Sequence, residues 1–186
     1  MPPRTVADAD NSPWKTCAEH VVYNNQWMRV TEYDVIRPDG SPGIYGVADP
    51  GDNATIAATD ELGRVLLIRD FVYPVQQWKW LLPGGAIESG ELPLAAAQRE
   101  LLEEGGLFAE DWRLLGSFFL SAGISPQVSY CYTARKLTAM QAAPEPTEMI
   151  TRKWVFLREA AEMIRSGEIQ HSTAALAIMT LLLQSH

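Results

Sequence analysis

Cysteine and histidine are scarce in this sequence of 186 residues. The two cysteines, Cys17 and Cys131, are too few for a disulfide framework or a cysteine-based metal site, so we expect ordinary thiols. The three histidines, His20, His171 and His186, do not cluster with residues that would suggest a metal site or a catalytic triad, and we expect structural or surface roles for them.

Positive charge is also in short supply, because 15 lysines and arginines face 23 aspartates and glutamates, for a net charge of −8. Nucleic acids and anionic membrane surfaces both attract a basic face, so this balance argues against either as the main partner. A polyphosphate substrate would be repelled at long range as well. Bound cations would therefore be needed if the substrate were of that kind.

Long apolar runs are missing too. No stretch approaches the length needed to cross a bilayer, and the N-terminal sequence MPPRTVADADNSPWK has no hydrophobic signal region. We therefore expect a cytoplasmic protein.

The composition, 47% hydrophobic and 20% charged, is ordinary globular material, enough for one buried core. We expect a flexible arm over residues 1–16, a β-hairpin region over 17–50 and the main domain over 51–186. From Val21 apolar and polar residues roughly alternate up to a turn at residues 38–40, and 44–48 form a returning strand, giving an antiparallel hairpin or small sheet. Such an element is marginal alone and must pack on its own domain or on a second copy.

The main domain alternates short strands with a few helices. Strands are predicted at 54–58, 64–71, 78–82, 112–120 (one long strand or a pair), 127–134 and 153–157, with a loop over 138–149. Helices are predicted at about 92–105, at 158–166, and at 174–184 with Ser172 or Thr173 as its cap. This order predicts an α+β sandwich.

The stretch GGAIESGELPLAAAQRELLEEGGL, residues 84–107, carries most of the recognisable chemistry. Pro93 suits the first turn of a helix, and the glycines at 105 and 106 supply its end. At about 100° per residue, one side of this helix would form the buried seam, made of Leu94, Ala97, Gln98, Leu101 and Leu102. The three acids Glu100, Glu103 and Glu104 would share a patch on the adjoining flank.

Clustered acids near the C-terminal end of a helix repel one another and oppose its dipole. A hard divalent cation reverses that cost, because Mg²⁺ and Mn²⁺ bind clustered carboxylate and carbonyl oxygens. The loop before the helix can offer the bare carbonyl of Gly84, since glycine has no side chain to obstruct it. We therefore expect Mg²⁺ (or Mn²⁺) to bind through Gly84, Glu100, Glu103 and Glu104. The bland alternative is a solvated acidic helix face.

The spacing within this stretch resembles a known signature. Gly85, five residues, Glu91, seven residues, and then RELLEEGGL from Arg99 match the box that defines the Nudix hydrolases. The resemblance implies the Nudix fold, an α/β/α sandwich with a mixed β-sheet, and the hydrolysis of a nucleoside diphosphate linked to another group. It implies structural roles for Gly85, Glu91, Arg99 and Gly106, with Arg99 holding Glu91 in an ion pair.

A general base must reach the attacking water. Within the box the candidates are Glu103 and Glu104, although both can be occupied as metal ligands. The chain is most similar to the ADP-ribose pyrophosphatase branch, whose members supply an acid from a later loop. By that resemblance the candidates are Glu145 and Glu148, with Glu148 preferred because it lies nearer the next strand. They can also be plain solvated acids.

Members of that branch pair through their N-terminal strands and often hold the nucleotide base with an N-terminal aromatic residue. The resemblance therefore implies a homodimer and makes Trp27 a candidate substrate contact, the alternative being a buried structural tryptophan. The sequence departs from the branch at Val72, Leu81, Ala122 and Gln127, where the branch usually has arginine, an acid, proline and glutamate. Gln127 is a substrate-binding candidate that can hydrogen bond but cannot act as a base.

The sequence thus predicts a metal-dependent pyrophosphohydrolase that cleaves a nucleoside diphosphate sugar such as ADP-ribose into a nucleoside monophosphate and a sugar phosphate. The same chemistry on a GDP-sugar, NADH or a dinucleoside polyphosphate is the alternative within the superfamily. A nucleotide-sugar sensor without turnover is the alternative from another class. The complete set of box acids argues against the sensor.

Overall fold

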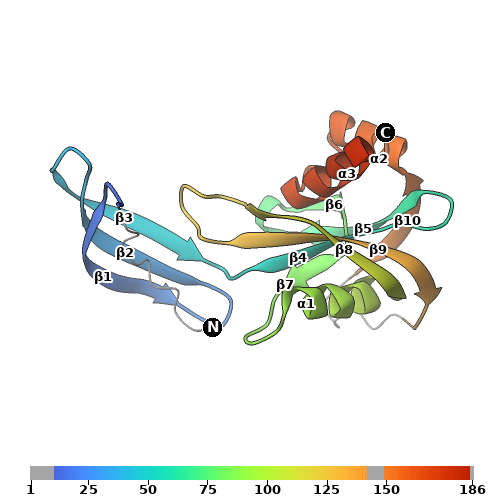
Figure 1. The fold of residues 1–186 in the computed structure, drawn as a ribbon, viewed down its shortest axis with the longest axis horizontal. Coiled ribbons are helices and arrows are strands. Elements are labelled where there is room, and N and C mark those ends of the chain that lie inside the picture. The colour runs from blue at the N-terminus through green and yellow to red at the C-terminus, as the bar shows by residue number, and fades with distance from the viewer. Residues whose placement is uncertain (1–10, 142–148, 185–186) are drawn as a thin grey trace. The chain divides into compact units, whose positions relative to one another are not determined.

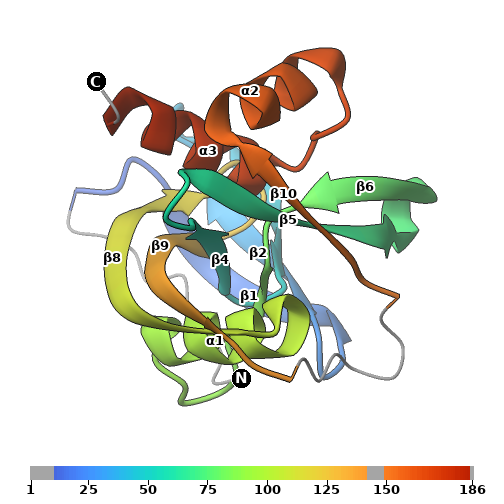
Figure 2. The same ribbon diagram turned by 90° about the vertical axis from the view of Figure 1, so that its right-hand side faces the viewer.

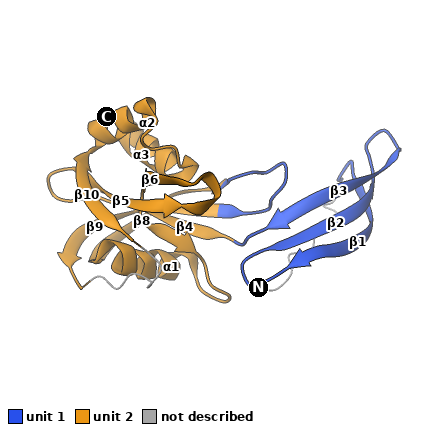
Figure 3. Cartoon of the chain, turned by 180° about the vertical axis from the view of Figure 1, so that it is seen from behind, with its two compact units in different colours: residues 1–51, 119–128 blue, residues 52–118, 129–186 orange. Residues whose placement is uncertain are grey.

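The computed structural model describes residues 11–141 and 149–184, which form the strands and helices labelled in Figure 1. Two compact units make up the chain, residues 1–51 with 119–128 and residues 52–118 with 129–186 (Figure 3). Among the described residues, no helix is long and apolar enough to cross a membrane.

The first unit is a three-stranded antiparallel sheet in the order β1 (Lys15–Asn24), β2 (Arg29–Ile36), β3 (Pro42–Asp49). The small sheet is therefore confirmed, with one more strand than a hairpin. The extra turn lies at Asn25, whose Oδ1 accepts hydrogen bonds from the backbone N–H groups of Trp27 and Met28 at 2.9 and 2.8 Å. Strand β1 begins at Lys15 and so covers the last two residues of the expected flexible arm, and residues 1–10 lie outside the described part.

The first unit also includes the turn between two long strands of the main domain, β8 (Leu107–Phe119) and β9 (Val128–Ala139). The backbone N–H of Ala48 donates to the carbonyl of Ile124 at 2.9 Å, and the hydroxyl of Tyr45 donates to the carbonyl of Gly123 at 2.7 Å. Segments far apart in the sequence thus share one unit.

The second unit holds two sheets. One has the order β10 (Thr151–Phe156), β5 (Arg64–Val72), β6 (Gln77–Leu81), and the other has the order β7 (Gly84–Ala86), β4 (Asn53–Ala58), β9, β8. Strand β4 pairs parallel with β9 and antiparallel with β7, so the sheet is mixed. These pairings confirm the predicted α+β class.

Helices cover the sheets of the second unit on two sides. Helix α1 (Pro93–Glu100) lies on one side, and α2 (Leu157–Ser166) and α3 (Ser172–Gln184) lie on the other (Figure 2). Two buried clusters fill the layers. One joins the sheets to α2 and α3 through side chains such as Val65 and Ile178, and the other joins them to α1 through Leu66 and Ala97. This layering places α1 against the sheets, where its residues can contribute to a functional site.

Several element boundaries differ from the predictions. Residues 84–86, expected as loop, pair with β4 as strand β7, and β9 continues to Ala139, into the expected loop. Helix α3 begins at Ser172 itself, so Ser172 and Thr173 are not its cap. The hydroxyl of Thr173 instead accepts a buried hydrogen bond from Thr55 at 3.1 Å, because this end of the helix packs against β4.

Candidate active site

The acid-rich helix begins and ends at the predicted residues but is not uniform. Pro93 occupies its first turn after an extended Leu92, and Gly106 closes it in the left-handed conformation with φ 66°. Between them α1 runs to Glu100, and residues Leu101–Gly105 form a π-helical turn. Such turns are rare and are frequent at functional sites. The π turn contains Glu103 and Glu104, two of the three clustered acids.

The predicted buried seam of this helix was wrong at Leu94, Gln98 and Leu102, which are exposed. The buried positions are Ala96, Ala97, Glu100, Leu101, Glu104 and Gly105. The small alanines allow close packing against β4, whose Ala54 and Ile56 lie in the same buried cluster. Glu100 and Glu104 share that inner face, with only 8% and 7% of their surface exposed. Two of the acids therefore point into the protein.

The glycine pair before the helix makes room for the acids. A Cβ on Gly85 would lie 2.2 Å from Oε1 of Glu100, so only glycine leaves space for that carboxylate. Gly84 has φ +156°, and a Cβ there would lie 2.3 Å from the carbonyl oxygen of Ala54. The backbone N–H of Gly84 donates to Oε2 of Glu104 at 2.7 Å. Both glycines thus place the carboxylates of the inner helix face.

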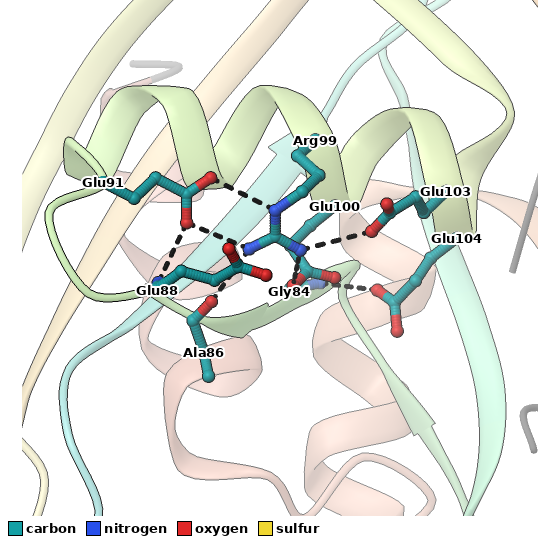
Figure 4. Close-up of polar contacts among 8 residues, drawn as sticks. All are labelled: Gly84, Ala86, Glu88, Glu91, Arg99, Glu100, Glu103 and Glu104. Atoms are coloured by element: carbon teal, nitrogen blue, oxygen red, sulfur yellow. Dashed lines mark hydrogen bonds and ion pairs between the residues drawn. The ribbon is translucent and has the colours of Figure 1, made fainter. Parts of the chain in front are cut away.

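Arg99 is the hub of the site (Figure 4). Its Nε and Nη2 donate to the carboxylate of Glu91, both at 3.1 Å, and Nη2 also donates to the carbonyl of Ala86 at 2.9 Å. Its Nη1 donates to Oε1 of Glu100 at 2.7 Å and to Oε2 of Glu103 at 3.2 Å. The predicted ion pair with Glu91 is present, and Arg99 binds two further acids that were not predicted as its partners.

These contacts shift proton affinities in opposite directions. The side-chain hydrogen bonds from Arg99 hold the pKa of Glu91 below its ordinary value of 4.5, and the backbone N–H of Glu88 adds to that effect. The hydrogen bonds to Glu91 in turn raise the pKa of Arg99. Both groups therefore stay charged at neutral pH.

Glu91→Gln tests this pairing through the pH dependence of stability. Because folding lowers the pKa of Glu91, its carboxylate contributes stability above about pH 4.5, and the contribution is lost as pH falls through the folded-state pKa. We expect the variant to be less stable than the wild type at pH 7, with a gap in the free energy of unfolding that closes toward pH 3. Urea unfolding at both pH values measures this. A gap of the same size at both would contradict the assignment.

The chemical types of these side chains suit a divalent cation. In the described part of the chain no three acidic, histidine or cysteine side chains already form a metal cage. However, Nη1 of Arg99 lies between the carboxylates of Glu100 and Glu103, so two acids already converge on one positive atom. Carboxylates are the donors that Mg²⁺ and Mn²⁺ prefer, and the third, Glu104, is buried on the same helix.

Other predicted site residues lie outside this cluster. Trp27 is 72% exposed at the turn between β1 and β2, so the alternative of a buried tryptophan is wrong. Gln127 donates its backbone N–H to the hydroxyl of Ser125 at 3.2 Å. Both belong to the first unit, whereas the box belongs to the second. Glu145 and Glu148 fall outside the described residues, and the roles of all four remain predictions.

One residue beside the cluster was missed. Nε of Arg152, on β10, donates to the main-chain carbonyl of Glu104 at 2.5 Å. The two are separated by 48 residues, so no local pattern could connect them. Predicting this contact would have required the pairing of β10 with β5, which places Arg152 opposite Ile68.

Comparison with known proteins decides the family. The NUDIX domain family matches residues 49–174, and the nucleoside diphosphate sugar hydrolase N-terminal domain family matches residues 14–48. The chain belongs to the Nudix family. As a Nudix hydrolase it acts on pyrophosphate bonds, and Nudix proteins generally use divalent metals.

Curated relatives of this Nudix chain span nearly its whole length. It is 30% identical to the CMP-5'-(N-acetyl-N-hydroxy-3-aminopropyl)phosphonate hydrolase of Streptomyces rubellomurinus (strain ATCC 31215), over 91% of this chain and 82% of the relative. It is 28% identical to the ADP-ribose pyrophosphatase of Bacillus subtilis (strain 168), over 91% and 93%. The predicted resemblance to the ADP-ribose pyrophosphatase branch is thereby confirmed.

A solved structure shares the fold. The crystal structure of an ADP compounds hydrolase superposes with a TM-score of 0.84, covering 95% of this chain and 96% of that chain at 17% sequence identity. At that identity the likeness concerns the fold alone. The predicted Nudix fold, a mixed sheet between helices with a small N-terminal sheet ahead of it, is confirmed.

Proposed function

We propose that this Nudix hydrolase cleaves a nucleoside diphosphate sugar such as ADP-ribose to a nucleoside monophosphate and a sugar phosphate, with Mg²⁺ or Mn²⁺ as cofactor. The observation that carries the proposal is the arrangement of the box, in which Arg99 gathers Glu91, Glu100 and Glu103 while Glu104 is buried against Gly84. The N-terminal domain family adds the nucleoside diphosphate sugar as the substrate class.

Each box residue has a defined part. Glu100, Glu103, Glu104 and the carbonyl of Gly84 would hold the metal, which when bound neutralises phosphate oxygens and makes a bound water more acidic. Arg99 keeps the carboxylates of Glu100 and Glu103 in place. The N–H of Gly84 does the same for Glu104. These contacts hold the metal-ligating carboxylates in position before the substrate binds, which lowers the free-energy cost of assembling the reacting groups.

The attacking water must lose a proton to a general base. Glu103 and Glu104 are placed at the cluster but are already assigned as metal ligands. Glu148, with Glu145 second, is our candidate for the general base, since it closely precedes β10 in the sequence and β10 carries Arg152, which contacts Glu104. Trp27 and Gln127 are our candidates for contacts to the nucleotide base and the sugar.

We also propose that the protein works as a homodimer joined through its first unit. Apolar side chains stand exposed on that sheet, among them Val21, Val22, Tyr23 and Ile44. Exposed apolar groups of this kind are typical of surfaces that bind another protein. Size-exclusion chromatography with light scattering should give twice the mass of the chain, and a monomer at micromolar concentration would overturn the proposal.

A hydrolysis panel tests the function. The purified protein is incubated with Mg²⁺ or Mn²⁺ and with ADP-ribose, GDP-mannose, NADH, diadenosine tetraphosphate or a CMP-linked phosphonate, and the products are identified by mass spectrometry. We expect the largest kcat/KM for ADP-ribose, with AMP and ribose 5-phosphate as products and no turnover in EDTA.

Other results of the panel would change the proposed substrate, activity or mechanism. A larger kcat/KM on another compound would replace ADP-ribose as the substrate while keeping the chemistry. Tight binding of ADP-ribose without cleavage in Mn²⁺ would favour a sensor. Cleavage that continues unchanged in EDTA would overturn the metal-dependent mechanism.

A further inference from the structure

The box arginine has no donor left for substrate. A guanidinium carries five N–H donors. In Arg99 all of them are engaged, by Glu91, Glu100, Glu103 and the carbonyl of Ala86. A diphosphate brings at least two negative charges into a cluster of acids. A second cation beside the cluster would therefore favour substrate binding. Arg99 cannot act as that cation without breaking one of its present hydrogen bonds.

Arg152 is placed to be that cation. On β10 it lies opposite Ile68 of β5, which in turn lies opposite Leu81 of β6. Residues directly opposite each other in an antiparallel pair share a face of the sheet. The next pair on the same face is Trp154 and Leu66. This pair packs in the buried cluster that contains Leu101 of the box helix, the acid-rich helix over residues 93–105. This face of the sheet therefore covers the box helix.

Arg152 contacts the acid-rich helix through its Nε. Nε donates to the carbonyl of Glu104, which anchors the guanidinium at the C-terminal end of the box helix. Among the described residues, Nη1 and Nη2 of Arg152 make no hydrogen bond. Two parallel N–H groups on one guanidinium match the oxygens of a phosphate. The side chain is thus fixed at one end and open at the other.

We propose that Arg152 binds a phosphate of the substrate, an inference that rests on the proposed pyrophosphohydrolase function. Nε holds the side chain against the helix that carries the metal ligands, while Nη1 and Nη2 hydrogen bond phosphate oxygens. The contact neutralises part of the substrate charge that the acidic box repels. Arg152 supplies affinity for the diphosphate and leaves metal binding to the box.

A purely structural role is the competing explanation. A cation at a helix C-terminus is favourable on its own and satisfies a carbonyl that lacks a partner within the helix. In that case the loss of Arg152 would lower stability and disturb Glu104. The two roles differ in which constant they change, because a cap positions the metal ligand whereas a phosphate contact binds substrate.

The test compares Arg152→Gln and Arg152→Lys with Lys153→Gln, in the full chain. Lys153 is the adjacent cation on the opposite face, where its Nζ contacts Glu159 at 3.0 Å, so its removal controls for net charge. The measurements are KM and kcat for ADP-ribose in Mg²⁺, Mn²⁺ affinity by electron paramagnetic resonance, and Tm. If wild type prefers another substrate of the panel, that compound replaces ADP-ribose.

We expect Arg152→Gln to raise KM at least about tenfold, the usual cost of losing hydrogen bonds to a charged group, with Mn²⁺ affinity changed less than about twofold. Arg152→Lys should raise KM by a smaller factor, because it keeps the charge without the paired donors. Lys153→Gln should leave KM unchanged. An unchanged KM in Arg152→Gln, or a fall in Mn²⁺ affinity as large as the rise in KM, overturns the inference. A wild type that cleaves no compound of the panel overturns the proposed function itself.

Discussion

Glu104→Gln should lower kcat by about 100-fold or more while the protein remains folded. Glutamine keeps the shape of the side chain and an oxygen that can accept from the N–H of Gly84, so the 2.7 Å contact that holds β7 is retained. What is lost is one negative charge among the metal ligands. Initial rates with Mg²⁺ at saturating substrate measure the effect.

Stability separates a missing ligand from a damaged fold. Glu104 is 7% exposed, and glutamine keeps its shape and the hydrogen bond from Gly84, so the metal-free variant should have a Tm close to that of the wild type. The rise in Tm on adding Mg²⁺ should shrink in the variant, since ligand binding to the native state is weakened. Glu110→Gln, an exposed acid on β8, serves as the control and should change neither rate nor Tm. Normal turnover in Glu104→Gln would place the metal site elsewhere.

Gly85→Ala should also reduce kcat/KM by about 100-fold, although it adds only one methyl group and touches no charge. The new Cβ would lie 2.2 Å from Oε1 and 2.6 Å from Cδ of Glu100, so the carboxylate must leave its position. That movement breaks the 2.7 Å contact with Nη1 of Arg99. The displaced group is the end of a flexible side chain, so the fold should survive and the loss should appear in catalysis. Steady-state kinetics with Mg²⁺ measure it.

Two other glycines provide the comparison. A Cβ added to Gly46 on β3 would meet no atom within 4 Å, so Gly46→Ala should be silent in both rate and Tm. Gly84→Ala would bring Cβ to 2.3 Å from the backbone oxygen of Ala54 and requires φ +156°, so it should lower Tm as well as activity. If Gly85→Ala retains wild-type kcat/KM, Glu100 is not held where we place it.

Much of the box could be predicted because its signals are local. Proline in the first turn and glycine after the last one fix the ends of the helix through backbone conformation alone, and Pro93 and Gly106 lie where expected. The ion pair between Arg99 and Glu91 followed from the resemblance, and the structure contains it. Local signals did not determine which side of the helix faces the core. We expected Leu94 and Leu102 inside, yet both are exposed. The face that packs against β4 instead carries two alanines, Leu101 and two acids.

The sequence by itself determined that this chain is a Nudix hydrolase with an acid-rich box, because helix ends, turns and the spacing of the acids depend on residues within about one or two turns of each other. The tertiary structure alone decided that Glu100 and Glu104 face inward and that Arg152 reaches the carbonyl of Glu104. Those contacts depend on which strands pair and in which register. The free energy that sets the register comes from packing the whole unit, so no short segment contains it.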